Sequence, residues 1–213
     1  MSSQIARPFI ALDQSLEQKV KDAALQRLKK GKPVWDVFHT LKAVDYMKQL
    51  LINEGGNARI LLSAIYLHDI GYSLTKISGK KEIGFTTVLT YKQQHALLGS
   101  KEAEKILRQI NEFTEEEIKE IVRLVFVHDE WWNTRIKDFD ANFNDFMITE
   151  ADTLGMIDPE VPQNFSAEER ARFINEELIP FRIPLFRTIY GKVKLKELLQ
   201  KQALLVIDYP ENF

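Results

Sequence analysis

The segment at 63–73, SAIYLHDIGYS, is an apolar helical stretch that ends in adjacent His68 and Asp69, with Gly71 close behind. Burying an imidazole beside a carboxylate costs on the order of several kcal/mol unless each group has a partner. Two arrangements could supply the partners: a structural ion pair, or a metal ion that binds both groups. The His-Asp pair is therefore the first candidate for chemistry.

The other histidines, His39, His95 and His128, also lie on or at the edge of apolar helical stripes. A single histidine on an apolar face is usually a core residue whose hydrogen bonds are satisfied. Four such histidines, taken together with Asp69 and a similarly placed Asp152, instead favour a site at which imidazoles and carboxylates converge.

Asp152 lies in the apolar segment ITEADTLGMID, where Gly155 on the same helical face would let another backbone or a bound ligand approach closely. Imidazole and carboxylate ligands without thiolates suit hard or borderline cations such as Mn, Fe, Mg, Co or Ni. The chain has no cysteine, which excludes disulfides, thiolate zinc sites and cysteine nucleophiles. The sequence therefore predicts a site for one or two divalent metal ions.

Helical periodicity predicts the elements that position these residues. The predicted helices span 16–30, 34–54, 58–69, 93–110, 115–128, 142–157, 166–178 and 192–207. Thr114 with Glu117, and Ser166 with Glu169, have the spacing of a capping box. The stretch 71–91 is less regular, and its segment FTTVLTY is either a short strand or the start of the next helix, while the prolines of IPFRIPLFR interrupt the pattern. We expect an all-α, single-domain bundle of about eight helices around the central helix 58–69.

The bulk composition is that of a soluble globular protein of one domain: 213 residues, 45% hydrophobic and 28% charged. The chain has 29 Lys and Arg against 31 Asp and Glu, so no global charge points to nucleic acid or a membrane as a partner. No segment has the apolar length of a secretion signal or a membrane span. We expect a cytoplasmic protein, and the oligomeric state stays open.

Three segments resemble the HD superfamily of metal-dependent phosphohydrolases, which is named for its adjacent His and Asp. LLSAIYLHDIGYS is similar to the segment with that pair, VFHTLKAV to the helix with the first histidine, and TEADTLGMI to the segment with the last aspartate. The family often has Arg where this chain has Thr153. The resemblance covers 34–157 and implies one HD-type domain over 1–213, with helices of 166–213 packing on or capping the metal-site core.

Two further segments, YKQQHALLGS and EIVRLVFVHD, resemble a subset of the superfamily that has two additional histidines and tends to hold two metals. The resemblance implies that His39, His68, Asp69 and Asp152 hold the first metal. It implies that Asp69 bridges to a second metal on His95 and His128, or that these two histidines bind a substrate phosphate. His128 and Asp129 form a second His-Asp doublet, which is expected to be accidental, because on a helix Asp129 would point about 100° away from His128.

The function that this resemblance implies is hydrolysis of a nucleotide or another small phosphate ester by metal-activated water. Two alternatives stay open. Some relatives with these ligands hold two irons and oxygenate small substrates, and the chain could also be a non-catalytic module that binds metal or nucleotide.

An anionic substrate needs further cations or a stacking surface. The candidates are Lys42, Lys76, Lys80, Lys81, Trp131 and Arg135, with Lys137, Arg182 and Arg187 as further cations. Each of these lysines could equally be a solvated loop residue, and the tryptophan could be ordinary packing. The segment 72–85 contains two glycines and the basic pair Lys80 and Lys81, so it is either a lid over the site or a plain connection.

Overall fold

The computed structural model describes residues 9–31, 33–75, 85–129, 142–161 and 173–201. The regular secondary structure within these ranges is helical except for one short parallel pair, β1 (Phe9–Ile10) with β2 (Gly56–Asn57). The prediction of an all-α fold is therefore confirmed. Among the helices of these ranges, none is both long and apolar enough to cross a membrane.

The first three helices build the centre of the fold. They are α1 (Gln14–Leu28), α2 (Pro33–Glu54) and α3 (Ala58–Leu67). Asn57 caps α3 by accepting a hydrogen bond from the backbone N–H of Arg59, at 3.0 Å. Most of α3 is buried because α1, α2, α5 and α7 all pack against it. The expected central helix is thus the one that ends at the His-Asp pair.

The segment after the His-Asp pair forms a 3-10 helix, η1 (Ile70–Leu74), and the chain is described again from α4 (Phe85–Ile110). The FTTVLTY segment is therefore the start of a helix and not a strand, because packing of the long helix α4 on η1 and α5 outweighs the preference of its β-branched residues. Helix α5 (Glu115–Val127) begins with the predicted capping box: Thr114 Oγ1 accepts from Glu117 N, and Glu117 Oε2 accepts from Thr114 N.

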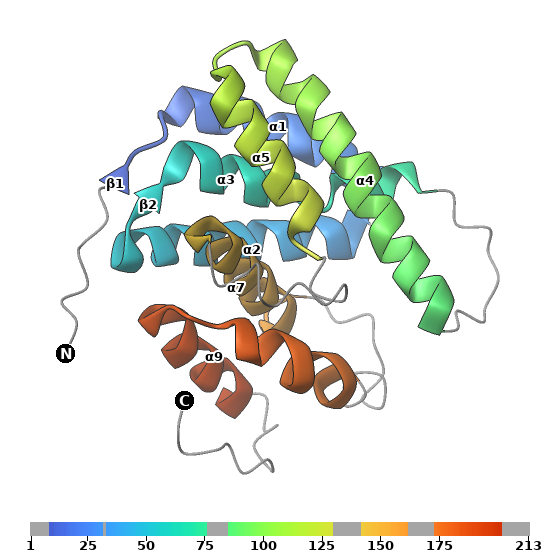
Figure 1. Cartoon of the computed structure of the whole chain (residues 1–213), viewed down its shortest axis with the longest axis vertical. Helices are drawn as coiled ribbons and strands as arrows, with labels where there is room; N and C mark the ends of the chain where they lie inside the picture. Colours follow the sequence, from blue (N-terminus) through green and yellow to red (C-terminus); the bar gives the residue numbers. More distant parts are fainter. Residues whose placement is uncertain (1–8, 32, 76–84, 130–141, 162–172, 202–213) are drawn as a thin grey trace.

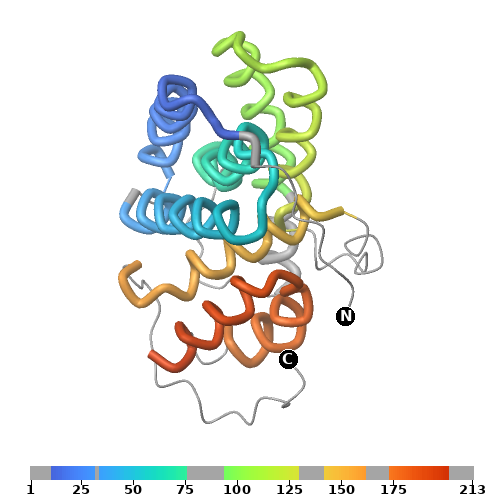
Figure 2. Tube along the Cα trace, turned by 90° about the vertical axis from the view of Figure 1, so that its left-hand side faces the viewer, coloured from blue at the N-terminus to red at the C-terminus, as the bar shows by residue number. Residues whose placement is uncertain are grey.

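Helix α7 (Phe143–Ile157) lies between α2 and the C-terminal elements, as Figure 1 and Figure 2 both show. Gly155 permits its close packing on α2, since a Cβ atom there would lie 2.9 Å from the backbone of Ala43. The expected close approach at Gly155 is therefore that of a neighbouring helix.

The C-terminal elements are η3 (Ile174–Arg182), η4 (Ile183–Leu185) and α9 (Ile189–Lys201). The prolines do not end the helical path where the sequence predicted, because η3 widens into a π-helix that accommodates Pro180. The predicted capping box at 166–169 lies outside the described residues. Helix α9 begins earlier than expected because the buried carboxylate of Glu150, on α7, accepts hydrogen bonds from the backbone N–H groups of Arg187 and Thr188. A negative charge at that point also stabilises the helix N-terminus.

Candidate metal centre

Five helical elements deliver the six predicted ligands to one buried region. His39 comes from α2, and His68 and Asp69 follow the end of α3. His95 comes from α4, His128 from the end of α5, and Asp152 from α7. All six side chains are buried.

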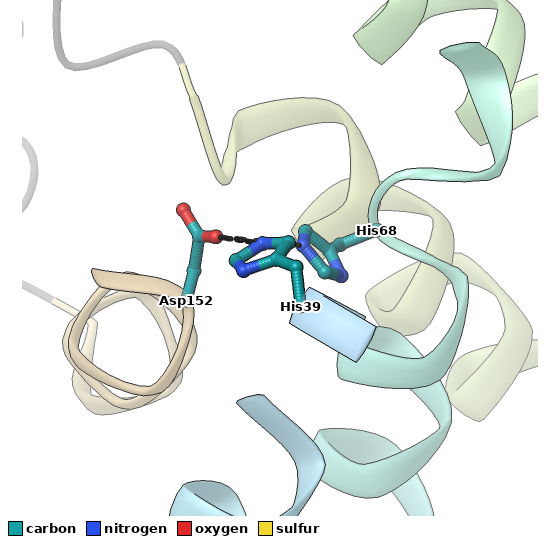
Figure 3. Close-up of side chains that lie close together, drawn as sticks. All are labelled: His39, His68 and Asp152. Atoms are coloured by element: carbon teal, nitrogen blue, oxygen red, sulfur yellow. Dashed lines mark hydrogen bonds and ion pairs between the residues drawn. The ribbon is translucent and has the colours of Figure 1, made fainter. Parts of the chain in front are cut away.

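His39, His68 and Asp152 form what we call the first triad. The Nε2 atoms of His39 and His68 lie 3.1 Å apart, and Asp152 Oδ1 lies 3.0 Å from the first and 3.4 Å from the second. Figure 3 shows the three side chains turned toward one another from α2, the end of α3 and α7. Their ligand atoms therefore surround a common point.

Asp69, His95 and His128 form the second triad. The Nε2 atoms of His95 and His128 lie 3.2 Å apart. Asp69 Oδ1 lies 3.7 Å from His95 Nε2 and 3.5 Å from His128 Nε2. The arrangement repeats that of the first triad, with two imidazole nitrogens and one carboxylate oxygen.

Asp69 also faces the first triad with its other oxygen. Its Oδ2 lies 3.5 Å from His39 Nε2 and 3.3 Å from His68 Nε2. One carboxylate thus presents one oxygen to each triad. A carboxylate between two cations about 3.5–4 Å apart is what a dinuclear site needs, because an anion must offset their mutual repulsion.

Backbone carbonyls orient one imidazole in each triad. His68 Nδ1 donates to the carbonyl oxygen of Ile65 at 2.8 Å, and His128 Nδ1 donates to that of Val125 at 2.7 Å. Both acceptors lie in the last turn of a helix, where carbonyl groups lack a helical partner. Because Nδ1 must carry the hydrogen, Nε2 of the neutral ring has its lone pair directed into the centre, as a metal ligand requires.

Aromatic rings orient the other imidazole in each triad. His39 stacks on Trp35 with ring centroids 5.6 Å apart, and His95 stacks on Tyr72 with centroids 4.0 Å apart. The Nδ1 atoms of His39 and His95 have no hydrogen-bond partner among the described residues. Neither aromatic residue was predicted as part of the site, although Trp35 precedes His39 by one helical turn and so lies on the same helix face.

Gly71 explains the glycine that follows the His-Asp pair. A Cβ atom on Gly71 would overlap the carbonyl oxygen of His95 and would lie 2.8 Å from the backbone nitrogen of Gly99. The absent side chain therefore lets α4 pack directly on η1. This contact brings His95 beside Asp69.

The electrostatics differ among these groups. Burial opposes ionisation of Asp69 and Asp152, but the pKa of Asp69 is held well below its usual range by His68 and that of Asp152 by Arg182. Burial would lower the pKa of His68, but the Asp69 and Asp152 carboxylates raise it well above its ordinary value. Burial, followed by the neighbouring His128, lowers the pKa of His95 to about 4.

Arg182 and Asp129 also belong to this region. Arg182 Nη1 lies 2.8 Å from Asp152 Oδ2 and 3.1 Å from Thr153 Oγ1, while Nη2 lies 2.7 Å from Asp129 Oδ1. Asp129 belongs to neither triad, and its carboxylate pairs with Arg182, a contact that the sequence did not indicate. The sequence predicted Arg182 only as a cation for substrate, but its guanidinium is buried between two carboxylates.

Most of the other predicted substrate contacts lie outside the described residues and stay predictions: they are Lys76, Lys80, Lys81, Trp131, Arg135 and Lys137. The lid at 72–85 also stays a prediction, because most of that segment lies outside the described residues. Lys42 is described, and its Nζ lies 2.5 Å from Glu160 Oε2 and 3.9 Å from Asp158 Oδ2. Arg187 Nη1 donates to the carbonyl oxygen of Pro184 at 2.6 Å. Lys42 would have to leave these carboxylates before it could bind a phosphate.

The residues present fit divalent metal ions. Two Nε2 atoms 3.1 or 3.2 Å apart can share only one proton, and each pair is faced by buried carboxylate oxygens. A cation at the centre of each triad would satisfy all of these lone pairs at once. The nitrogen and oxygen donors suit Mn, Fe, Mg, Co or Ni.

The described residues thus define a class: helical proteins with two buried His/Asp triads, each of which could hold a metal ion. Within that class, the family model described as HD domain matches residues 37–178. The chain belongs to the HD domain family, whose members are mostly metal-dependent phosphohydrolases. Neither the curated proteins nor the solved structures gave a match to the chain.

Proposed function

We propose that the protein hydrolyses a small phosphate ester, with a nucleotide as the first candidate, at a dinuclear centre of divalent metal ions. The observation that supports this most directly is the position of Asp69, which presents one carboxylate oxygen to each triad. Membership in the HD domain family supports the same reaction class.

Each side chain has a distinct role in this proposal. His39, His68 and Asp152 would hold one ion together with Asp69 Oδ2, and His95 and His128 would hold the other together with Asp69 Oδ1. When bound, such a pair of ions lowers the pKa of a water molecule and neutralises charge on a phosphoryl group. The buried helices around the triads keep bulk water away and strengthen these interactions.

The charge of the region suits an anionic substrate. Three carboxylates, those of Asp69, Asp129 and Asp152, surround the centre with one guanidinium, that of Arg182. With neutral imidazoles, two divalent ions would turn this excess of negative charge into an excess of positive charge. A phosphate group would therefore be attracted to the loaded centre and would not be attracted to the metal-free one.

The test is a phosphate-release screen over nucleotides and sugar phosphates with protein that has been stripped by a chelator and reloaded with Mn, Co, Mg or Fe. We expect release that depends on added metal and is lost in Asp69→Asn. Asp145→Asn is the matched control, because Asp145 is also a buried, ion-paired aspartate, on α7, and its partner is Arg123.

Turnover by the stripped protein, or by Asp69→Asn, would contradict the proposed mechanism. Iron enrichment with oxygen consumption and no phosphate release would instead assign the centre to a di-iron oxygenase. Metal binding without either reaction would assign it to a non-catalytic binding module.

A further inference from the structure

Arg182 is the largest of the fully buried side chains among the described residues, with 1% of its surface exposed. It is the last residue of η3, far from the triads in sequence, and its guanidinium reaches Asp152, Thr153 and Asp129. A buried guanidinium must be paired to offset its desolvation. The two carboxylates provide that pairing and link η3 to α7 and to the end of α5.

The two oxygens of Asp152 contact different groups. Oδ2 accepts from Arg182 at 2.8 Å, and Oδ1 lies 3.0 Å from His39 Nε2 in the first triad. Arg182 therefore does not occupy the position where an ion would sit. It approaches the carboxylate from the opposite side and fixes the rotation that turns Oδ1 inward.

The two oxygens of Asp129 are divided in the same way. Oδ1 accepts from Arg182 at 2.7 Å, while Oδ2 lies 3.9 Å from His95 Nε2 in the second triad. Asp129 Oδ2 therefore flanks the second triad of Asp69, His95 and His128, where it could accept a hydrogen bond from a water molecule bound to a second ion. One guanidinium thus orients a carboxylate at each triad.

We propose that Arg182 is a positioning residue for the whole metal centre, holding Asp152 as a ligand of the first ion and Asp129 as an anchor for the water on the second. This inference rests on the proposed metal centre and adds to it a residue of the C-terminal part of the chain and a carboxylate outside the two triads. Outer partners of metal ligands commonly account for 10–100-fold in affinity, because they fix the orientation of the ligand.

The test is titration of the stripped protein with Co²⁺, followed by its visible absorption, and with Mn²⁺, followed by calorimetry. We expect Arg182→Met to weaken binding of both ions by roughly 10–100-fold. Asp129→Asn should weaken only the second ion. Arg182→Lys should weaken both ions less than Arg182→Met does, because an ammonium keeps the charge but cannot donate in two fixed directions.

Arg123→Met is the matched control. Arg123 also pairs with a buried aspartate, Asp145, at 2.8 Å, and its removal should lower thermal stability while leaving both metal affinities unchanged. If Arg182→Met does not fold, Arg182→Lys and Asp129→Asn still carry the test, since each keeps a polar group of similar size in place.

Wild-type metal affinity in Arg182→Lys and Asp129→Asn, or tighter binding in Arg182→Met, would overturn the inference and leave Arg182 as a structural ion pair. A wild-type protein that binds no metal would overturn the proposed function and this inference with it. Metal binding without phosphate release would overturn the proposed hydrolysis alone, because the titration does not depend on turnover.

Discussion

The two triads are built alike but differ in what surrounds them. Each has one imidazole fixed by a backbone carbonyl and one stacked on an aromatic ring. In the first triad, neighbouring carboxylates raise the pKa of His68, whereas in the second, burial lowers that of His95 to about 4. His68 in the metal-free first triad therefore holds a proton more tightly than an ordinary histidine does, and His95 in the second triad holds one more weakly. The same ligand types thus make two sites with different competition between metal and proton.

The largest effect is expected from removing the Asp69 carboxylate, which faces both triads. Asp69→Asn keeps the size of the side chain but removes the negative charge that faces both triads. We therefore expect the affinity for each ion to fall by more than about 100-fold. Metal content after dialysis, measured by mass spectrometry, checks this. Retention of one ion at full affinity would show that Asp69 serves a single site. Circular dichroism should show an intact fold, because the apolar helices remain.

Substitutions confined to one triad should remove one ion and leave the other bound. His39→Gln removes a ligand from the first triad only, and His128→Gln removes one from the second only, so we expect each variant to retain about one ion. Metal titration by calorimetry gives the stoichiometry of each. Loss of both ions in both variants would mean that the two sites do not fill independently, which would contradict a separate ion in each triad.

The pH dependence should separate the triads next. Because Asp69 and Asp152 raise the pKa of His68 in the metal-free protein, an ion must displace the His68 proton, and first-site affinity should rise with pH until the raised pKa is passed. His95 is neutral above pH about 5 and adds no such dependence there. Calorimetry in two buffers of different ionisation enthalpy measures the released proton.

The same shift predicts a change in stability. A histidine whose folded pKa is raised stabilises the metal-free fold fully below its unfolded pKa of about 6.5, and this stabilisation is lost as the pH rises through the folded value. Thermal unfolding of the stripped protein, measured from below pH 6.5 upward, checks whether its stability falls as the pH rises. A metal-free protein that becomes more stable as the pH rises above 6.5 would contradict a raised pKa of His68.

The smallest effect is expected from the stacked rings. Trp35→Leu should weaken the first ion and Tyr72→Leu the second, each by roughly 2–10-fold, since aromatic pairing contributes about 0.5–1.5 kcal/mol beyond burial. The readout is again metal titration, with each variant serving as the control for the other site. Equal weakening of both ions by one substitution would show that stacking supports the fold in general and not one triad.

Much of this arrangement could be predicted from the sequence because it rests on local pattern. Apolar periodicity located the helices that carry His39, His95 and Asp152, and the capping box located the start of α5. The site residues could be proposed because buried polar groups are rare and need partners.

The parts that could not be predicted depend on contacts between distant segments. Nothing local to Arg182 shows that it reaches Asp152, because a π-helix and a long stretch of chain intervene. The pairing of Asp129 with Arg182 could not be predicted for the same reason, since the two residues are 53 positions apart in the chain. Thr153 stands where the resemblance led us to expect an arginine, and the guanidinium that contacts it comes instead from Arg182.

The most direct test of a dinuclear centre bridged by Asp69 is anomalous diffraction from crystals of the protein loaded with Mn²⁺ or Co²⁺. We predict two anomalous peaks about 3.5–4 Å apart, one within each triad, with the Asp69 carboxylate between them. A single peak in the first triad, with Asp69 bound to it alone and with His95 and His128 hydrogen-bonded to each other, would contradict the account.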